Sequence, residues 1–320
     1  MKLSGDWFQN EATQQVFSFL NDAGFQAHMV GGCVRNALLG QPVSDIDIST
    51  DATPETVSKL AQTAGLKAIP TGVEHGTVTV VSGGEPHEIT TYRKDIETDG
   101  RRAVVAFSKS MVEDAERRDF TMNAIYADAQ DQVVDPLGGI DDLLARRVRF
   151  IGSAHDRIRE DYLRILRFFR FTAWYGDQSL GWDVESLSAI SSNLAGLETL
   201  SKERVGHEIK RLLLAPNPAP ALAVMEQTGV LHAILDGADT KTMPILVHLE
   251  EAAQLELSFT RRLAALGGRN VADAFRLSKS DERDRAAIQH AAMSYQTRKR
   301  LDTALEIALG WMRNCFVQPI

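Results

Sequence analysis

The chain of 320 residues has little cysteine and no long apolar run. Its two cysteines, Cys33 and Cys315, are too few for a disulfide framework, and there is no CxxC pair to bind a metal ion. No apolar stretch approaches the ~18–20 residues that a membrane-spanning helix needs. The first residues, MKLSGDWF, also lack the apolar segment of a secretory signal. We therefore expect a protein of the reducing cytoplasm without a membrane partner.

An excess of positive charge is also absent, because 43 acidic residues outnumber 35 basic ones and give a net charge of −8. This balance argues against a protein that coats nucleic acid nonspecifically, which would be basic overall. Basic residues are nevertheless concentrated between Arg146 and Arg170, where there are eight arginines and three acids. This stretch is either a surface that binds a polyanion or a solvated helix face.

Residues 29–48, MVGGCVRNALLGQPVSDIDI, contain a glycine pair near their start. Gly31 and Gly32 follow a short apolar run and open a segment in which apolar residues recur at helical spacing. Glycines allow backbone N–H groups to approach a phosphate at a helix N-terminus. Arg35 lies in the first turn of this helix and can reach the same anion. The pattern predicts a phosphate-binding turn that includes Gly32 and Arg35.

The same stretch ends with two carboxylates, Asp45 and Asp47, in a β-like alternation. On a strand, positions i and i+2 point to the same side, so these carboxylates should converge. Two like charges this close need a cation, and Mg²⁺ prefers oxygen ligands. Glu88 starts another β-branched segment, EITTY, and from a neighbouring strand could complete the cluster. We expect Asp45 and Asp47 to bind Mg²⁺, with Glu88 either a third catalytic carboxylate or an ordinary surface acid.

Two later segments also have informative patterns. Residues 93–104, RKDIETDGRRAV, are polar and aperiodic, which predicts a mobile loop. Residues 112–127 have helical periodicity. They include Arg117 and Arg118, which are candidates for contacts with a triphosphate or a base.

Residues 156–174 predict one amphipathic helix whose polar face carries residues spaced by three: Asp161, Arg164, Arg167 and Arg170. Glu160 lies four positions before Arg164 and can hold its guanidinium. Cytosine and adenine both present an amine donor beside a ring-nitrogen acceptor, which an Asp acceptor and an Arg donor match. Guanine and uracil present the reverse order, which would leave both side chains unpaired at a cost of ~1–3 kcal/mol. Asp161 and Arg164 are therefore either a base-reading pair or part of a salt-bridged helix.

Four ordered motifs resemble those of the class II tRNA nucleotidyltransferase (CCA-adding enzyme) and bacterial poly(A) polymerase family. They are GGCVRNALLG followed by DID, then RRDFTMNA, DPLGGIDDL and EDYLRILRFFRF. The family usually has Asp at the position of Asn36 and Pro at the position of Tyr162. The first difference puts a local Arg–Asp contact in doubt, whereas the second should matter little at a helix N-terminus.

The resemblance implies an α+β nucleotidyltransferase head, with a polymerase-β-like mixed sheet, over residues 1–150. A helical neck with a nucleotide-base template would span 151–215, and a helical RNA-binding body 216–320. It also implies two Mg²⁺ ions on Asp45 and Asp47, and a tRNA 3′-hydroxyl that attacks CTP or ATP. The residues implied to clamp the nucleotide are Gly32, Arg35, Arg118, Arg167 and Arg170, while Asp161 and Arg164 would read its base.

Two features distinguish the members of this family. Poly(A) polymerases carry a Gly-Arg-Arg-Phe signature after the metal motif, whereas this chain has TGVEHG at residues 71–76. Enzymes that add only CC lack the loop that residues 93–104 retain. We therefore expect full CCA addition, with poly(A) or A-only addition as the alternative. There are two further alternatives: a non-catalytic RNA-binding relative, and a transferase that acts on a small molecule or a protein.

Overall fold

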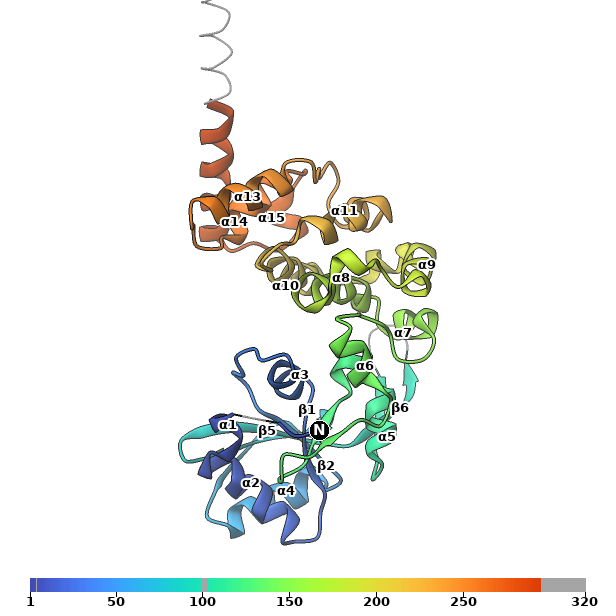
Figure 1. Cartoon of the computed structure of the whole chain (residues 1–320), viewed down its shortest axis with the longest axis vertical. Helices are drawn as coiled ribbons and strands as arrows, with labels where there is room; N and C mark the ends of the chain where they lie inside the picture. Colours follow the sequence, from blue (N-terminus) through green and yellow to red (C-terminus); the bar gives the residue numbers. More distant parts are fainter. Residues whose placement is uncertain (4, 99–102, 295–320) are drawn as a thin grey trace, which may run out of the picture. The chain divides into compact units, whose positions relative to one another are not determined.

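The computed structural model describes residues 1–3, 5–98 and 103–294. The chain divides into two compact units, Met1–Leu200 and Ser201–Ile320. The first contains a mixed sheet with helices around it, and the described part of the second is largely helical (Figure 1). The fold class expected from the sequence is therefore confirmed. The three-part division at residues 150 and 215 stays a prediction.

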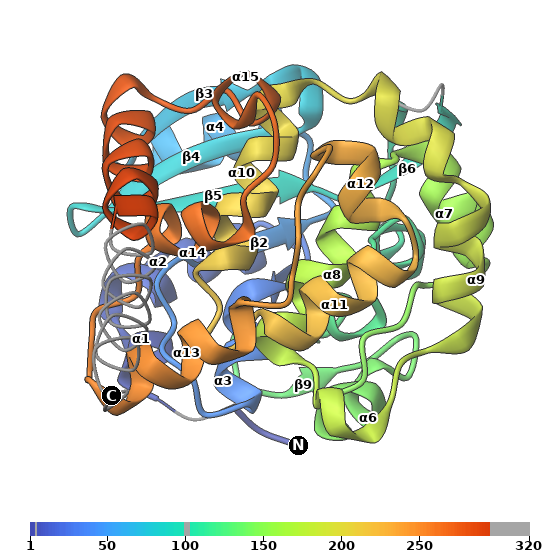
Figure 2. The ribbon, with the colours of Figure 1, turned by 90° about the horizontal axis from the view of Figure 1, so that it is seen from above.

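A seven-stranded sheet forms the centre of the first unit, with strand order β3-β4-β5-β2-β1-β8-β9. Only β2 and β5 run parallel to each other; every other neighbouring pair in this sheet is antiparallel. Figure 2 shows β3, β4, β5 and β2 side by side in this order. The strands are β1 (Ala27–Val30), β2 (Asp47–Thr50), β3 (Lys67–Gly72), β4 (Thr77–Ser82), β5 (Glu85–Thr91), β8 (Tyr126–Ala127) and β9 (Val133–Val134).

The two faces of this sheet differ in polarity, because successive side chains along a strand point to opposite faces. In β2, Ile48 is buried on one face, while Asp47 and Ser49 lie on the other. Helices α2 (Glu11–Asn21) and α4 (Pro54–Thr63) pack against the apolar face of the sheet (Figure 1). Because the helices cover the apolar face, the polar face with Asp47 and Ser49 is the one that can carry a catalytic site.

The prediction of a loop over residues 93–104 is wrong for those residues of the segment that the structure describes. Strand β6 (Arg93–Thr98) pairs with β7 (Ala103–Phe107) in an antiparallel two-stranded sheet, and residues 99–102 lie outside the described residues. The segment 93–104 ends inside the run AVVAF, residues 103–107, whose two valines and phenylalanine favour a strand.

The helix expected over residues 112–127 is shorter. It comprises α5 (Met111–Glu116), followed by a 3₁₀ turn at Thr121–Asn123 and then β8. The buried Asp119 carboxylate accepts hydrogen bonds from the Phe120 N–H at 2.8 Å and the Asn123 amide at 2.9 Å. An Asp side chain that bonds nearby groups in this way competes with the helical hydrogen-bond pattern.

The helix expected over residues 156–174 is interrupted for a similar reason. It consists of α7 (Ala154–Glu160) and α8 (Leu163–Tyr175), separated at Asp161, whose backbone is extended (φ −155°, ψ 106°). The Asp161 carboxylate, one residue before the N-cap Tyr162, accepts the N–H of Leu163, the first residue of α8, at 3.1 Å. Asp161 therefore belongs to a helix start and not to a helix interior.

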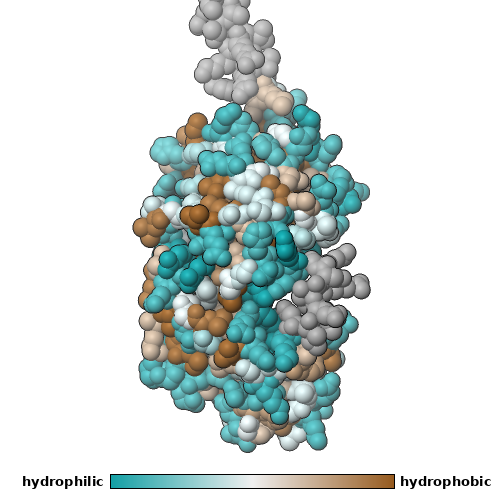
Figure 3. All heavy atoms as spheres, turned by 90° about the vertical axis from the view of Figure 1, so that its right-hand side faces the viewer, coloured by the Kyte–Doolittle hydropathy of each residue, from teal (hydrophilic) through white to brown (hydrophobic). Residues whose placement is uncertain are grey.

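The remaining helices complete both units. In the first unit they are α1 (Asp6–Gln9), α3 (Gly32–Leu38), α6 (Gly139–Leu144) and α9 (Val184–Ser192). In the second they are α10 (Lys202–Leu213), α11 (Ala219–Gln227), α12 (Val230–Ile234), α13 (Met243–Ala252), α14 (Phe259–Leu266) and α15 (Val271–Ala274), and residues 279–294 are also helical. Among the described residues, no helix combines the length and the apolar character needed to cross a membrane. Hydrophilic residues cover much of the face drawn in Figure 3, with hydrophobic ones in small groups between them.

Candidate active site

Three carboxylates come together at the polar face of the sheet. Asp47 is the first residue of β2, and Glu88 of β5 is its partner in the parallel register, so both side chains lie on the same face. Loss of water contacts raises the pKa of Asp47, the carboxylates of Glu88 and Asp45 raise it further, and Arg118 opposes them. This is the electrostatic signature of a crowded acidic group that a bound cation would relieve.

Asp45 differs from the expectation that it shares a strand with Asp47. Strand β2 begins at Asp47, and its pairing with β1 ends at Ile48, so no neighbouring strand is paired with the chain at Asp45. Asp45 is exposed, and its carboxylate accepts the Ser44 hydroxyl at 3.0 Å. It therefore lies in the segment that precedes β2, and its carboxylate contributes to the raised pKa of Asp47.

In the described ranges, no group of three or more His, Cys, Asp or Glu side chains is arranged to enclose a metal ion. Mg²⁺ is commonly bound by one or two carboxylates together with waters and substrate phosphates, and not by an all-protein cage. The carboxylate oxygens of Asp45 and Asp47 fit that donor set.

The glycine turn lies beside these acids. Gly31 has a φ of +74°, a left-handed conformation that glycine adopts without a steric penalty, and Gly32 is the first residue of α3. A Cβ added to Gly31 would lie 3.6 Å from Nη1 of Arg118. The turn therefore places backbone next to a guanidinium, an arrangement suited to a phosphate.

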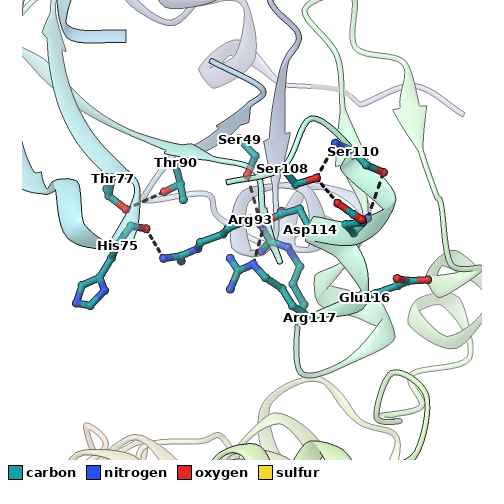
Figure 4. A network of polar contacts seen from close by, with 12 residues as sticks. Ser49, His75, Thr77, Thr90, Arg93, Ser108, Ser110, Asp114, Glu116 and Arg117 are labelled. Carbon is teal, nitrogen blue, oxygen red and sulfur yellow. Dashed lines mark hydrogen bonds and ion pairs between the residues drawn. The ribbon is translucent and has the colours of Figure 1, made fainter. Parts of the chain in front are cut away.

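Arg118 connects this turn to the polar face of the sheet. Its guanidinium forms an ion pair with Asp114 at 2.9 Å and donates to the Ser49 hydroxyl at 3.4 Å and to the Tyr126 hydroxyl at 3.2 Å. Burial alone would lower the pKa of Arg118, but Asp114 and Tyr126 outweigh burial and raise it. Figure 4 shows Ser49, Asp114 and Arg117 within this network. Arg118 is thus a fixed positive charge close to Asp47.

Arg35 is more enclosed than a simple clamp for a ligand would be. It is buried, and its guanidinium donates to the Asn36 side chain at 3.2 and 2.9 Å, to Asn123 at 2.6 Å and to the Tyr175 hydroxyl at 2.8 Å. The Asn36 amide thus takes the place of the carboxylate usual in the family and keeps a local contact with Arg35. Burial lowers the pKa of Arg35, and Tyr175 and Asp119 oppose this effect.

The base-reading candidates lie at the start of α8. Arg164 donates to the Glu160 carboxylate, which confirms the expected pair, and also to the carbonyls of Arg157 at 2.7 Å and Arg117 at 3.2 Å. These contacts tie Arg164 to the RRDFTMNA motif and fix its direction. Asp161, three residues earlier, accepts the N–H of Leu163 at the start of the same helix.

Arg167 and Arg170 lie further along α8, near one aromatic ring. The guanidinium carbons of Arg167, Arg170 and Arg35 lie 5.4, 4.5 and 5.2 Å from the centre of the Phe171 ring. Arg167 also forms an ion pair with Asp119. Burial would raise the pKa of Asp119, but Arg167 and the Asn123 amide hold it down at about 2. The structure thus brings three of the predicted nucleotide-binding arginines together.

Sequence reasoning did not select Asp119 or Tyr175. Asp119 stands inside the RRDFTMNA motif, so its position was visible, but its partner Arg167 is 48 residues away. Tyr175 meets Arg35 across 140 residues, and no local pattern in the sequence signals that contact.

Comparisons with known proteins identify the family of this chain. Residues 27–149 match the model of the poly(A) polymerase head domain, and residues 183–241 match that of a probable RNA- and SrmB-binding site of polymerase A. A mitochondrial CCA tRNA nucleotidyltransferase 1 of Danio rerio is 41% identical over 207 residues, which are 64% of this chain and 48% of that protein. A CCA-adding enzyme of Streptococcus pyogenes is 40% identical over 214 residues, which are 66% of this chain and 51% of that protein. The chain thus spans about half the length of these curated relatives.

Solved structures give the same result. The CCA-adding enzyme of Bacillus stearothermophilus, solved in complex with CTP, superposes with a TM-score of 0.77 at 33% sequence identity. The match covers 91% of this chain and 71% of that one. The chain therefore belongs to the CCA-adding enzyme and bacterial poly(A) polymerase family of nucleotidyltransferases.

Proposed function

We propose that this protein adds C, C and A to the 3′ ends of tRNA, using CTP and ATP and releasing pyrophosphate, and that it does so in the cytoplasm. The observation that carries the proposal is the parallel register that sets Glu88 beside Asp47, with Asp45 and Arg118 next to them. Acidic groups and a fixed cation at one face of a sheet suit transfer of a nucleotide, in which most of the catalysis is positioning and charge stabilisation.

Asp45 and Asp47 would hold Mg²⁺, which when bound makes the attacking hydroxyl more acidic and offsets the charge on the phosphates. Glu88 would add a third carboxylate at the same place. The clamp residues Gly32, Arg35, Arg118, Arg167 and Arg170 would orient the triphosphate and balance its charge.

Base choice would depend on Asp161 and Arg164 at the start of α8. The ion pair with Glu160 and the bonds to two backbone carbonyls hold the Arg164 guanidinium in one orientation. Preorganised donors of this kind discriminate well, because a base of the wrong hydrogen-bond order leaves them unpaired. In this scheme residues 1–150 act as the catalytic head, 151–215 as the neck and 216–320 as an RNA-binding body.

The direct test is nucleotide incorporation on a tRNA transcript that lacks its 3′ CCA, with Mg²⁺ and with each nucleotide alone and in combination. Three additions that require both CTP and ATP are expected. A long ladder with ATP alone would indicate poly(A) polymerase, and one A added only to tRNA ending in CC would indicate an A-adding enzyme. The absence of any product would favour the non-catalytic RNA-binding alternative.

Replacing Arg164 by Ala should relax base choice. The loss of one directional donor is expected to reduce the preference for CTP over UTP by about 10-fold to 100-fold, as for an unpaired buried polar group. Relative kcat/KM values for CTP and UTP on one tRNA measure this ratio. Arg159→Ala provides a control that leaves Asp161 and Arg164 intact. An unchanged ratio for Arg164→Ala would remove Arg164 from base recognition.

A further inference from the structure

Two rings of α8, Phe171 and Tyr175, lie against one side of the Arg35 guanidinium and are here called the aromatic bracket. The Tyr175 ring centre lies 3.9 Å from the guanidinium carbon of Arg35, and the Phe171 ring centre lies 5.2 Å from it. The two rings are 5.4 Å apart, one turn apart on α8. Stacking on ring faces stabilises a guanidinium and restricts its orientation.

The hydrogen bonds of Arg35 add to this restriction without neutralising its charge. Their acceptors are the side chains of Asn36, Asn123 and Tyr175, all of them uncharged. Other arginines in the unit contrast with this, since Arg118 and Arg157 form ion pairs with Asp114 and Glu160. The Asp119 carboxylate also acts on Arg35, but it is ion-paired with Arg167, so the charge of Arg35 stays available to an anion that arrives later.

The position of the bracket explains why such a charge would be useful. Arg35 lies in α3 just after the glycine turn, and a Cβ added to Gly32 would be 3.9 Å from its Nη2. Arg167 and Arg170 lie at the same Phe171 ring. Several guanidinium groups around one ring repel one another, and this repulsion is relieved when a polyanion binds among them.

We infer that Tyr175 is a positioning residue for nucleoside triphosphate binding, acting by holding Arg35 against the glycine turn through its ring and its hydroxyl. This inference rests on the proposed function, because it names a residue that supports the same nucleotide site. Tyr175 is the last residue of α8, and its hydroxyl accepts a hydrogen bond from Arg35 of α3. The proposed base-reading pair lies at the start of α8, and the contact with Arg35 lies at its end.

The test measures binding of CTP and ATP, with Mg²⁺, to the full chain and its variants. Tyr175→Phe keeps the ring and removes the hydroxyl, and is expected to weaken binding about threefold; Tyr175→Ala removes both and should weaken it about tenfold or more. Tyr162→Phe, which removes a phenol hydroxyl at the other end of α8, is the matched control and should leave binding unchanged. Thermal unfolding of Tyr175→Phe should match that of the unaltered protein.

A double-mutant cycle with Arg35→Met, and with Arg35→Lys as a second background, separates positioning from other roles. If Tyr175 acts through Arg35, then Tyr175→Phe should have no further effect on nucleotide binding in the Arg35→Met background. An equal loss in both backgrounds, or no loss in either, would overturn the inference.

The incorporation assay separates the two proposals. Unaltered protein that binds and incorporates nucleotides while the Tyr175 variants behave normally would defeat this inference alone. Unaltered protein that neither binds nor incorporates nucleotides would defeat both.

Discussion

Asp47→Asn is expected to reduce nucleotide incorporation at least about a thousandfold while leaving the fold intact. Asp47 is the carboxylate that β2 places in register with Glu88, close to Asp45 and Arg118. Loss of a metal-binding oxygen removes several kcal/mol of charge stabilisation from the transition state, and each 1.4 kcal/mol is about tenfold in rate. Single-turnover incorporation on a tRNA lacking CCA measures this loss.

The same substitution should not lower stability. The fold raises the pKa of Asp47, so its ionised form is disfavoured in the folded protein relative to the unfolded chain. Wherever Asp47 is ionised in the folded protein, its carboxylate therefore costs stability, and an amide of the same shape removes that cost. The midpoint of thermal unfolding should stay constant or rise, as is typical of residues kept for function and not for stability.

Glu55→Ala is a suitable control for Asp47→Asn. Glu55 is an exposed acid in the first turn of α4, the helix on the opposite, apolar face of the sheet. It should leave incorporation unaffected. Near-normal turnover of Asp47→Asn, measured beside this control, would exclude Asp47 from the reaction. A comparable loss with Glu88→Gln would establish Glu88 as the third carboxylate.

Much of this site could be predicted from local sequence. The glycine turn and the strand position of Asp47 follow from glycine geometry and strand alternation, whereas Asp45 lies outside the strand. Glu160 pairs with Arg164 as expected, although the pair spans the break between α7 and α8. The sheet then adds what no local pattern contains, namely the parallel pairing of β2 with β5 that sets Glu88 beside Asp47. Strand pairing depends on the whole fold. The sequence alone could therefore suggest a role for Glu88, but its position beside Asp47 comes from the structure.

Other features escaped local reasoning for identifiable physical reasons. Helical periodicity continued through residues 112–127 and 156–174, but Asp119 and Asp161 use their carboxylates to bond nearby N–H groups and interrupt the helices there. The surroundings of Arg35 depend on Tyr175, far along the chain. In the structure, Arg35 is a buried cation whose hydrogen-bond acceptors are neutral side chains.

Replacing Arg262 by Met in the second unit is expected to lower the free energy of unfolding by about 3–5 kcal/mol. Arg262 is only 1% exposed, and its Nε donates to Glu250 at 2.7 Å. Its Nη1 donates to the carbonyls of Leu213 and Ala215 at 2.7 and 2.6 Å. These carbonyls lie at the end of α10, where no further helical turn supplies donors. The substitution therefore leaves the carbonyls at the end of α10 without their donor and removes one of the two guanidinium groups that pair with the buried Glu250, of which Arg261 remains.

Arg269→Met is the matched control, since Arg269 also pairs with a carboxylate in the second unit, Asp236, at 2.9 Å. Both of these side chains are largely exposed, at 76% and 70%, so the change should cost no more than about 1 kcal/mol. Urea unfolding followed by circular dichroism gives the free energies, and hydrogen exchange of the α10, α13 and α14 amides shows whether the loss is in this unit. If both substitutions lowered the free energy of unfolding equally, the buried contacts of Arg262 would contribute no more to stability than an exposed ion pair. A larger loss with Arg262→Met would identify its guanidinium as the group that fixes α10 to α13 and α14.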